Sequence, residues 1–226
     1  MSTSTRPTFE TVRDIEHVFA RCEPLRIRYA PDELICQSGC YAAGVYLLTS
    51  GIVLESYVDR TSRAGDVATG LLGVGDLIGT ELLLAGQARL HQTSCRALSD
   101  VSLTFLERSA FEAAVEAHDP LRRFLAAHLA ERGLRLTRTL WRSQLAPEER
   151  LCALLLDLVL FAESADGMIT LPRELDHRLL ATLAHLPLRR ARQACRLLPG
   201  VEWREDRLAF SLDVLDDWRS TAEPSP

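Results

Sequence analysis

The hydrophobic pattern of the chain changes once, near Arg108, and this change constrains the fold more than any other feature. From Leu25 to Leu106, short apolar or alternating runs are separated by glycine and other turn residues. Such spacing predicts a β-sandwich or roll rather than repeated β-α-β units. After Arg108 the apolar residues recur every three or four positions, as they do on helices. We therefore expect an α+β chain with a β-rich first half and a helical second half.

One long helix is predicted between the two halves. Asp119 can serve as its N-cap, Pro120 suits its first position, and Pro147 closes it. A helix of this length must either lie across a neighbouring domain or pair with a second copy of itself. A narrow stripe favours pairing of two copies through residues 120–145. The stripe consists of Leu121, Leu125, Leu129, Arg132, Leu136, Leu140 and Ser143.

Two short helices joined by a tight turn are predicted near the C-terminus. Asp176 can cap the first helix, residues 185–187 form the turn, and Leu188–Leu198 form the second helix. This arrangement is a helix-turn-helix. Short apolar runs on both sides of residues 204–207 predict a β-hairpin wing behind it.

Charge is distributed unevenly along the chain. All 26 basic residues are arginine, and the net charge is −5. Residues 1–118 carry a net −5, residues 119–145 a net +4, and residues 146–226 a net −4. Within the last segment, Leu188–Arg196 holds four arginines and no acid. A local cluster of this kind is typical of a small phosphate-contacting footprint rather than of a general nucleic-acid coat.

The second helix of a helix-turn-helix reads base edges in the major groove. Arginine can bind guanine, and glutamine adenine, through two hydrogen bonds, each pair discriminating by about 1–3 kcal/mol. Residues expected to face the core are Leu188, Ala191, Ala194, Cys195 and Leu198. The candidate DNA-binding residues are Leu188, Arg189, Arg190, Arg192, Gln193 and Arg196. Arg190 and Arg192 equally suit phosphate contacts. The alternative interpretation is a solvated arginine-rich face.

The sequence argues against a membrane protein and against an enzyme. Its longest nearly apolar run, residues 151–162, contains Asp157 and is much shorter than the roughly 20 residues that cross a bilayer. The polar N-terminus lacks the apolar stretch of a signal peptide, so we expect a cytoplasmic protein with no membrane partner. No Ser-His-Asp, HExxH or P-loop arrangement is present.

Six cysteines are expected to be reduced, because the chain is long and is not predicted to be secreted. Cys36 and Cys40 form the only close pair, with no second pair or nearby histidine to complete a zinc site. We therefore assign no metal site.

Taken in order, these features resemble the cAMP receptor protein/FNR (CRP/FNR) family of bacterial transcription regulators over roughly residues 20–215. The resemblance rests on four stretches: YLLTSGIV around Gly51, GVGDLIGTELLL at 73–84, RALSDVSLTFLERSAFE at 96–112, and LAPEERLCALLLDL at 145–158. It implies a cyclic-nucleotide-binding-type β-roll (jelly roll) as the sensor domain at residues 1–118, a dimerisation helix at 119–145, and a winged helix-turn-helix DNA-binding domain at 146–226. The implied protein is a homodimer on a pseudo-palindromic operator in double-stranded DNA, with RNA polymerase as a further partner.

The effector site departs from the family pattern. Members that bind cAMP carry a Gly-Glu-Leu motif whose Glu takes the ribose hydroxyl, and an Arg-Ser pair that holds the phosphate. This chain has Gly79-Thr80-Glu81-Leu82 and, in place of the Arg-Ser pair, His91-Gln92. A phosphate needs a fixed cation, so we do not expect cAMP binding. Arg89 could replace that cation, and Thr137 or Thr139 could offer a hydroxyl to an adenine, although ordinary polar helix positions are the preferred interpretation of both threonines. The candidate effector residues are Gly79, Thr80, Glu81, Arg89, His91, Gln92, Thr137 and Thr139.

The resemblance does not firmly imply any cofactor. Iron-sulfur members hold their cluster with a compact N-terminal group of cysteines, and the spacing of Cys22, Cys36, Cys40 and Cys95 does not follow that pattern. Haem ligands are also known in the family. The candidates for such a ligand are His17, His91 and Cys95, for which packing or surface roles are the ordinary alternative.

The recognition helix departs as well. Members that read the common half-site carry Ser-Arg-Glu-Thr-Val-x-Arg, and the usual base-reading residues become Leu188, Arg189 and Gln193 here. The target sequence should therefore differ. His185 replaces the usual turn glycine, which predicts a distorted turn or an extended first helix. The alternative function is a ligand or redox sensor that acts through a protein partner, with a drifted winged helix.

Overall fold

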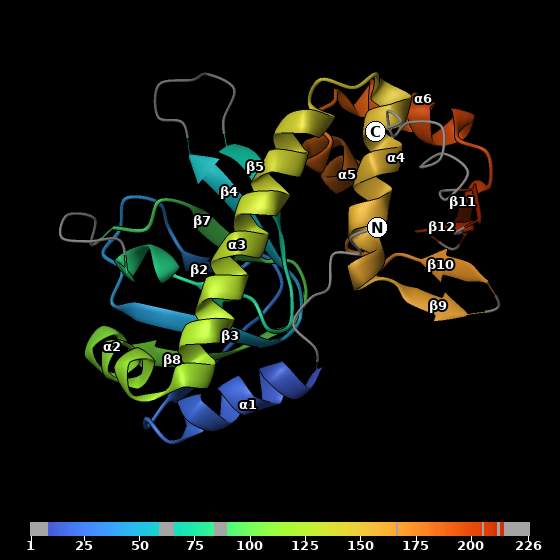
Figure 1. Ribbon diagram of the computed structural model, residues 1–226. Helices are drawn as coiled ribbons and strands as arrows, with labels where there is room; N and C mark the ends of the chain where they lie inside the picture. Colours follow the sequence, from blue (N-terminus) through green and yellow to red (C-terminus); the bar gives the residue numbers. More distant parts are fainter. Residues whose placement is uncertain are drawn as a thin grey trace, which may run out of the picture. The chain divides into compact units, whose positions relative to one another are not determined.

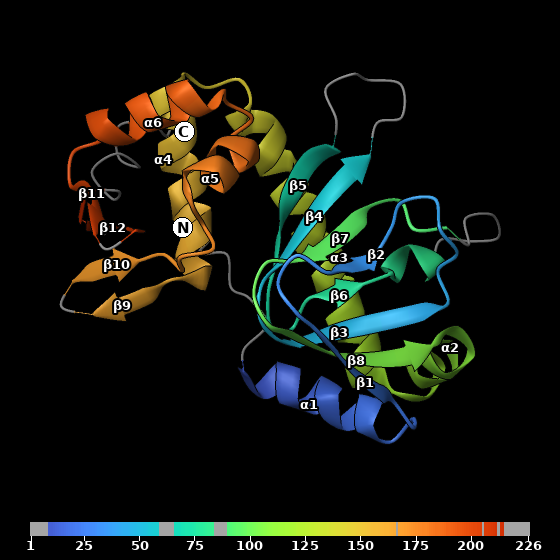
Figure 2. The same cartoon turned by 180° about the vertical axis from the view of Figure 1, so that it is seen from behind.

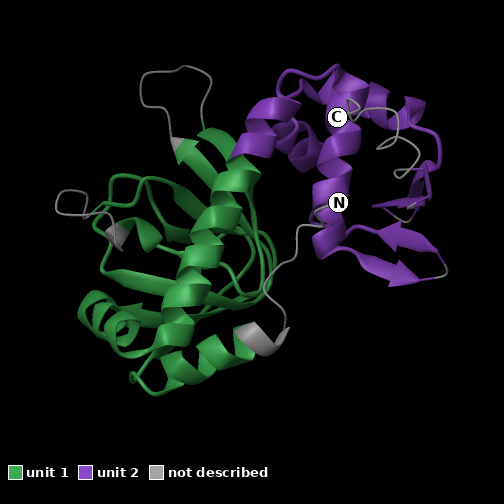
Figure 3. Cartoon of the chain, viewed as in Figure 1, with its two compact units in different colours: residues 1–136 green, residues 137–226 purple. Residues whose placement is uncertain are grey.

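The longest helix, α3 (Asp119–Arg142), crosses the division of the chain into two units, residues 1–136 and 137–226 (Figures 1 and 3). The computed structural model describes residues 9–58, 66–83, 90–165, 167–204, 206–211, 213 and 214. Each unit has its own hydrophobic residues packed inside it. The predicted α+β class is confirmed.

Short strands form the β-roll of the first unit. They are β1 (Leu25–Tyr29), β2 (Leu34–Cys36), β3 (Gly44–Ser50), β4 (Val53–Val58), β5 (Asp66–Leu72), β6 (Leu77–Ile78), β7 (Ser94–Ala97) and β8 (Val101–Glu107). Two antiparallel four-stranded sheets result, with strand orders β1-β8-β3-β6 and β2-β7-β4-β5 (Figure 2). A 3-10 helix, η1 (Thr80–Leu83), follows β6.

Gly51 shows why glycines separate these strands. It takes φ +92° between β3 and β4, and a Cβ at this position would stand 2.4 Å from the carbonyl oxygen of Asp100. Only a residue without a side chain fits both the left-handed conformation and the close backbone approach.

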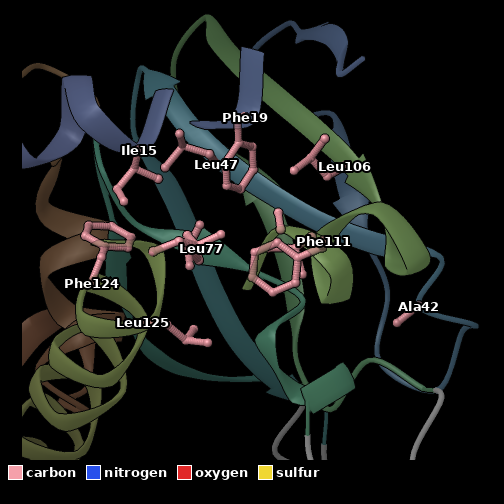
Figure 4. Packing of buried hydrophobic residues seen from close by; sticks show 12 residues of the cluster. Ile15, Phe19, Ala42, Leu47, Leu77, Leu106, Phe111, Phe124 and Leu125 are labelled. Carbon is pink, nitrogen blue, oxygen red and sulfur yellow. The ribbon is translucent and has the colours of Figure 1, made fainter. Parts of the chain in front are cut away.

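Helices cover one sheet of the roll. α1 (Phe9–Ala20) and α2 (Arg108–Ala117) contribute Phe19 and Phe111, whose rings meet edge to face at 6.0 Å. The cluster around them, drawn in Figure 4, joins helices α1, α2 and α3 to strands β3, β6 and β8. Its members are Ile15, Phe19, Ala42, Val45, Leu47, Leu77, Leu106, Phe111, Ala114, Leu121, Phe124 and Leu125. Helix α1 has no counterpart in the sequence predictions.

Helix α3 has two different faces. Leu121 and Leu125 are buried in the core of the first unit, so this start of the stripe lies against the β-roll instead of being open for pairing. Leu129, Leu136 and Leu140 are exposed, Leu140 at 70%. The start of the helix therefore lies across a neighbouring domain, the first of the two alternatives, while pairing of two copies stays a prediction for the exposed part. The helix ends at Arg142, before Pro147.

The second unit is a winged helix-turn-helix. Its elements are α4 (Pro147–Leu158), η2 (Val159–Phe161), β9 (Glu163–Ala165), β10 (Met168–Thr170), α5 (His177–Leu183), α6 (Leu188–Leu197), β11 (Val201–Arg204) and β12 (Arg207–Ser211). Helices α4 and α5 both pack on α6, and the four strands pair antiparallel in the order β11-β12-β10-β9. The predicted hairpin wing is confirmed. No helix within the described segments is long and apolar enough to span a lipid bilayer.

His185 occupies the turn between α5 and α6 without disrupting it. The residue takes φ +51°, while α5 ends at Leu183 and is not extended. Histidine is one of the non-glycine residues that enter the left-handed region more readily than most. The expected distortion is therefore absorbed at a single residue, and the turn keeps its length.

Candidate functional site

Helix α6 is held by its small inward-facing residues. Ala191, Ala194 and Cys195 are buried, so that α4 and α5 can approach it closely. Leu188 and Leu198 are half-buried. In front of α6, the Asp176 carboxylate caps α5 by accepting hydrogen bonds from the backbone N–H groups of Arg178 at 2.9 Å and Leu179 at 2.8 Å. This cap is the one expected from the sequence.

The outward face of α6 carries the cations. Its exposed side chains are Arg189, Arg190, Arg192, Gln193 and Arg196. Across the described residues, no carboxylate forms an ion pair with any of these four arginines. A surface hollow runs along this face, lined by Leu188, Arg189, Arg192, Gln193, Arg196 and Leu197. All of the candidate DNA-binding residues except Arg190 line that hollow.

The arginines of this face affect the pKa of the neighbouring residue His177. Burial lowers the pKa of His177, and the guanidinium groups of Arg192 and Arg196 lower it further, against the opposing effect of Asp176. The shift reports a positive potential beside α6. By contrast, the wing arginine Arg204 is paired with Glu202 at 2.8 Å. Four arginines without a carboxylate partner in the described part of the chain thus lie together on α6.

In the first unit, Gly79, Thr80, Glu81 and His91 lie together. The His91 Nδ1 atom is 2.9 Å from Glu81 Oε1, and both side chains are largely buried. Gly79 takes φ +89°, and a Cβ there would stand 2.6 Å from the carbonyl oxygen of Gly44. Burial raises the pKa of Glu81, but hydrogen bonds from His91 and the backbone, together with the charges of His91 and Arg132, lower it by more, so the carboxylate is held ionised. The Gly-Thr-Glu-Leu segment is therefore folded beside His91. Its Glu81 carboxylate already contacts His91, the residue at the position where cAMP-binding proteins carry arginine.

Two further carboxylates in this unit are paired with arginines of α3. Glu55 on β4 accepts hydrogen bonds from Arg132, from Thr93 at 2.9 Å and from Thr69 at 3.1 Å. Burial of Glu55 is nearly complete. Such a carboxylate must be paired to remain charged.

The second pair lies one turn further along α3. Arg135 donates to Asp76 at 2.7 and 3.3 Å, and the backbone N–H of Gly73 donates to the same carboxylate at 2.8 Å. His128, on the same face of the helix, is also buried beside Asp76. The sequence analysis did not identify Glu55, Asp76 or Arg135, and it treated Arg132 only as a member of the stripe. Arg132, a charged residue within an otherwise largely apolar stripe, was the one sequence signal that could have indicated a buried ion pair.

Of the remaining candidate effector residues, Gln92 belongs to the same unit as this group but is not part of it. Gln92 is exposed and its amide nitrogen donates to the Leu90 carbonyl at 3.1 Å. Thr137 and Thr139 belong to the second unit, where Thr139 accepts a hydrogen bond from Arg142 at 2.9 Å. Arg89 lies outside the described residues.

The surroundings of Cys36 correct one interpretation of the sequence. No histidine is near Cys36 along the chain, but the fold brings His91 close enough to lower the pKa of the Cys36 thiol and sets Cys95 opposite it on β7. Cys40, the expected pair member, is exposed. Even so, no group of three or more histidine, cysteine or acidic residues in the described part of the chain is arranged to hold a metal ion.

Comparison with known proteins agrees with this architecture. The sequence pattern of the cyclic nucleotide-binding domain family matches residues 26–118. No curated protein sequence matches the chain significantly.

Many solved structures share the fold. FixK2 from Bradyrhizobium japonicum superposes with a TM-score of 0.73 at 18% identity, covering 90% of this chain and 99% of that one. The c-di-GMP-responsive global regulator CLP from Xanthomonas campestris gives 0.70 at 22% identity, covering 87% and 97%. A CRP/FNR family transcriptional regulator from Thermus thermophilus gives 0.68 at 18% identity, covering 87% and 98%. Residues 26–118 are therefore similar to the cyclic nucleotide-binding domain family, and the chain shares the fold of solved CRP/FNR-type transcriptional regulators.

Proposed function

We propose that the chain is a sequence-specific, DNA-binding transcription regulator that acts as a homodimer and does not require cAMP. The observation that carries the proposal is the exposed face of α6, where Gln193 lies among four arginines that have no carboxylate partner within the described residues. Guanidinium groups bind phosphates and guanine edges, and glutamine binds adenine. The fold shared with CRP/FNR regulators supports the same function.

The proposed roles follow the segments predicted from the sequence. Residues 1–118 act as the sensor domain, residues 119–145 as the dimerisation helix, and residues 146–226 as the DNA-binding domain. Double-stranded DNA with two pseudo-palindromic half-sites is the proposed ligand, because each protomer of a symmetric dimer presents one recognition helix. RNA polymerase is the proposed protein partner at promoters.

The exposed face of α3 supports dimerisation. Leu129, Gly133, Leu136 and Leu140 are exposed and spaced by four, three and four residues. This spacing is typical of a coiled-coil seam. Apart from its chain neighbours and the adjoining helix backbone, a Cβ on Gly133 would meet no described atom within 4 Å, so there is room for close approach at this position. We propose that a second copy of the chain covers this seam.

Independence from cAMP is supported by the charges of the first unit. A cyclic phosphate requires a cation that is free to bind it. The cations described around Glu81 already face carboxylates of the same chain: His91 faces Glu81, Arg132 faces Glu55, and Arg135 faces Asp76. The CLP neighbour responds to c-di-GMP, which makes this nucleotide a second effector to test.

The test is selection of bound fragments from the genomic DNA of the source organism by the purified protein, without nucleotide, with cAMP and with c-di-GMP. We expect one palindromic motif to be enriched in all three arms. Enrichment only with one nucleotide would contradict ligand independence.

Binding should also weaken steeply with salt, because each neutralised phosphate releases counterions. Absence of any salt-dependent DNA binding in all arms would contradict the DNA-binding proposal and favour the protein-partner alternative.

Dimerisation has its own test. Leu136→Glu places a charge in the seam without touching the core of either unit, so the protein should become monomeric in light scattering and lose operator affinity. Thr137→Glu, beside the seam, is the matched control and should remain dimeric. A dimeric Leu136→Glu variant would contradict the assignment of the seam.

A further inference from the structure

Two cysteines face each other inside the cyclic nucleotide-binding domain. Cys36 at the end of β2 and Cys95 on β7 are paired residues of two antiparallel strands. Cys36 is 8% exposed and Cys95 is fully buried. Paired residues on antiparallel strands have Cα atoms about 4.5–5.5 Å apart, within the range that a disulfide spans.

A histidine and a carboxylate complete the group. His91 hydrogen-bonds Glu81 through Nδ1 at 2.9 Å, and it lies close enough to Cys36 for each group to shift the pKa of the other. The Cys36 thiol also faces the Thr93 carbonyl oxygen at 4.0 Å. Glu81, His91 and Cys36 thus form a carboxylate-imidazole-thiol relay, in which the carboxylate orients the ring and the ring supports a thiolate. Cys95 is the residue paired with Cys36 across the two strands.

The protons of this group are distributed unequally. Hydrogen bonding from the Cys95 thiol, followed by hydrogen bonding and charge from His91, lowers the pKa of Cys36 to about 6 despite burial. Burial opposes charge on His91, but hydrogen bonds with Cys36 and Glu81 raise its pKa to about 10. Hydrogen bonding to Cys36 and burial raise the pKa of Cys95. These directions favour the charge on Cys36 and His91 and the proton on Cys95.

We propose that Cys36 is a nucleophile toward hydrogen peroxide and that Cys95 converts the product into a Cys36–Cys95 disulfide. The thiolate sulfur of Cys36 attacks one peroxide oxygen, the O–O bond breaks, and the departing hydroxide takes a proton from His91 to leave water. The Cys95 sulfur then attacks the sulfenic acid sulfur, an S–S bond forms, the S–O bond breaks, and the hydroxide leaves as water with the Cys95 proton. Two thiols and one peroxide give one disulfide and two waters.

The remaining cysteines provide internal references. Burial raises the pKa of Cys152 and of Cys195 to about 11, so both should stay protonated and inert. Cys40 is exposed but has no place in the relay. Reactivity that follows exposure would select Cys40, whereas reactivity that follows the relay selects Cys36.

The test uses the full-length Cys40→Ser variant, because cleavage after arginine leaves Cys36 and Cys40 in one peptide, residues 29–60, and Cys95 in another, residues 90–96. After one equivalent of peroxide and blocking of free thiols, mass spectrometry should find these two peptides joined by a disulfide. Adding Cys95→Ser should instead leave Cys36 as a sulfenic acid that dimedone traps. Circular dichroism checks that each variant is folded.

A pH profile tests the relay in the reduced protein without relying on disulfide formation. Alkylation of Cys36 by iodoacetamide should fall only about twofold between pH 8 and pH 6, whereas an unperturbed thiol of pKa about 8.5 falls roughly 80-fold. His91→Gln should make the fall at Cys36 steeper than tenfold, and Glu81→Gln should lie between the two. A steep profile in the Cys40→Ser protein, or oxidation of Cys36 with no disulfide to Cys95, would overturn the proposal.

Discussion

The two units use arginine in opposite ways. On α3, Arg132 and Arg135 reach carboxylates of the β-roll and are largely covered. On α6, Arg189, Arg190 and Arg192 are exposed and have no described carboxylate partner. Because the chain contains no lysine, the residue type alone says nothing about which role applies. The role is indicated instead by whether a carboxylate lies beside the arginine. An arginine paired with a carboxylate has a structural role, whereas a cluster of unpaired arginines is available to an external anion.

The largest expected effect comes from breaking a pair in the first unit. Arg132→Ala leaves the Glu55 carboxylate buried without its cation, and removing one partner of a buried pair costs about 3–5 kcal/mol. Because Thr69 and Thr93 still donate to Glu55, we expect a loss of about 3 kcal/mol in the free energy of unfolding of this unit, measured by urea denaturation at pH 7.

Arg189→Ala is the matched control on α6 and should change that free energy by less than about 0.5 kcal/mol. Adding Glu55→Gln to Arg132→Ala removes the stranded charge and should recover part of the loss. Equal effects of Arg132→Ala and Arg189→Ala would remove the distinction between the two regions.

Acid should weaken the paired region through His128. Burial lowers the pKa of this residue to about 4, with Arg135 and Arg132 acting in the same direction against Asp76. The unfolded chain binds a proton near pH 6.5 that the folded chain refuses until about pH 4, so stability falls as pH decreases between these values. The loss should approach about 3 kcal/mol.

The His128→Gln variant isolates this contribution. Its free energy of unfolding should depend less on pH between 6.5 and 4 than that of the unsubstituted protein, while carboxylate protonation affects both alike. Chemical denaturation at a series of pH values measures the two slopes, and identical slopes would exclude His128 as the cause.

The unpaired region should show its effects in DNA binding instead. Arg189→Ala and Gln193→Ala should each relax base preference by about 1–3 kcal/mol at one position of the selected motif. Arg190→Ala, in the role of a phosphate contact, should weaken binding to all sequences alike. Binding titrations on the selected motif and on single-base variants separate these outcomes. If all three variants kept full affinity, α6 would not be the recognition helix.

The smallest expected effect is on the stability of the second unit and comes from removing a helix cap. Asp176→Ala removes the two N-cap hydrogen bonds of α5, which should cost about 1 kcal/mol of stability. Thermal melting of the second unit's transition measures this cost, and Asp176→Asn should retain most of the cap. A larger effect than that of Arg132→Ala on the first unit would reverse the order expected from burial.

Local patterns in the sequence were sufficient for most of the second unit. Asp176 as a cap, the tight turn and the buried small residues Ala191 and Ala194 depend on neighbours a few positions away. The strand spacing likewise predicted a β-roll. His185 was misjudged, because a single non-glycine residue can take a positive φ without altering the turn around it.

The contacts of the first unit could not be found in this way, because they join distant positions. Glu55 meets Arg132 across 77 residues, and Asp76 meets Arg135 across 59. Cys36 and Cys95 are brought together only by the pairing of β2 with β7. The roles of the candidate DNA-binding and effector residues stay predictions, because the structure shows where these side chains lie but not whether they bind DNA or an effector.

On helix α3, the arginines that contact the β-roll alternate with residues of the proposed dimerisation seam. Arg132 and Arg135 hold the β-roll, while Gly133 and Leu136, at adjoining positions, face away from it. A helix moves as a rigid body over such short distances, so losing either ion pair would remove one of the contacts that fix the orientation of the seam. In the proposed dimer, a change at Glu55 or Asp76 and the geometry of subunit pairing would be linked through α3 itself, with no separate transmitting segment required.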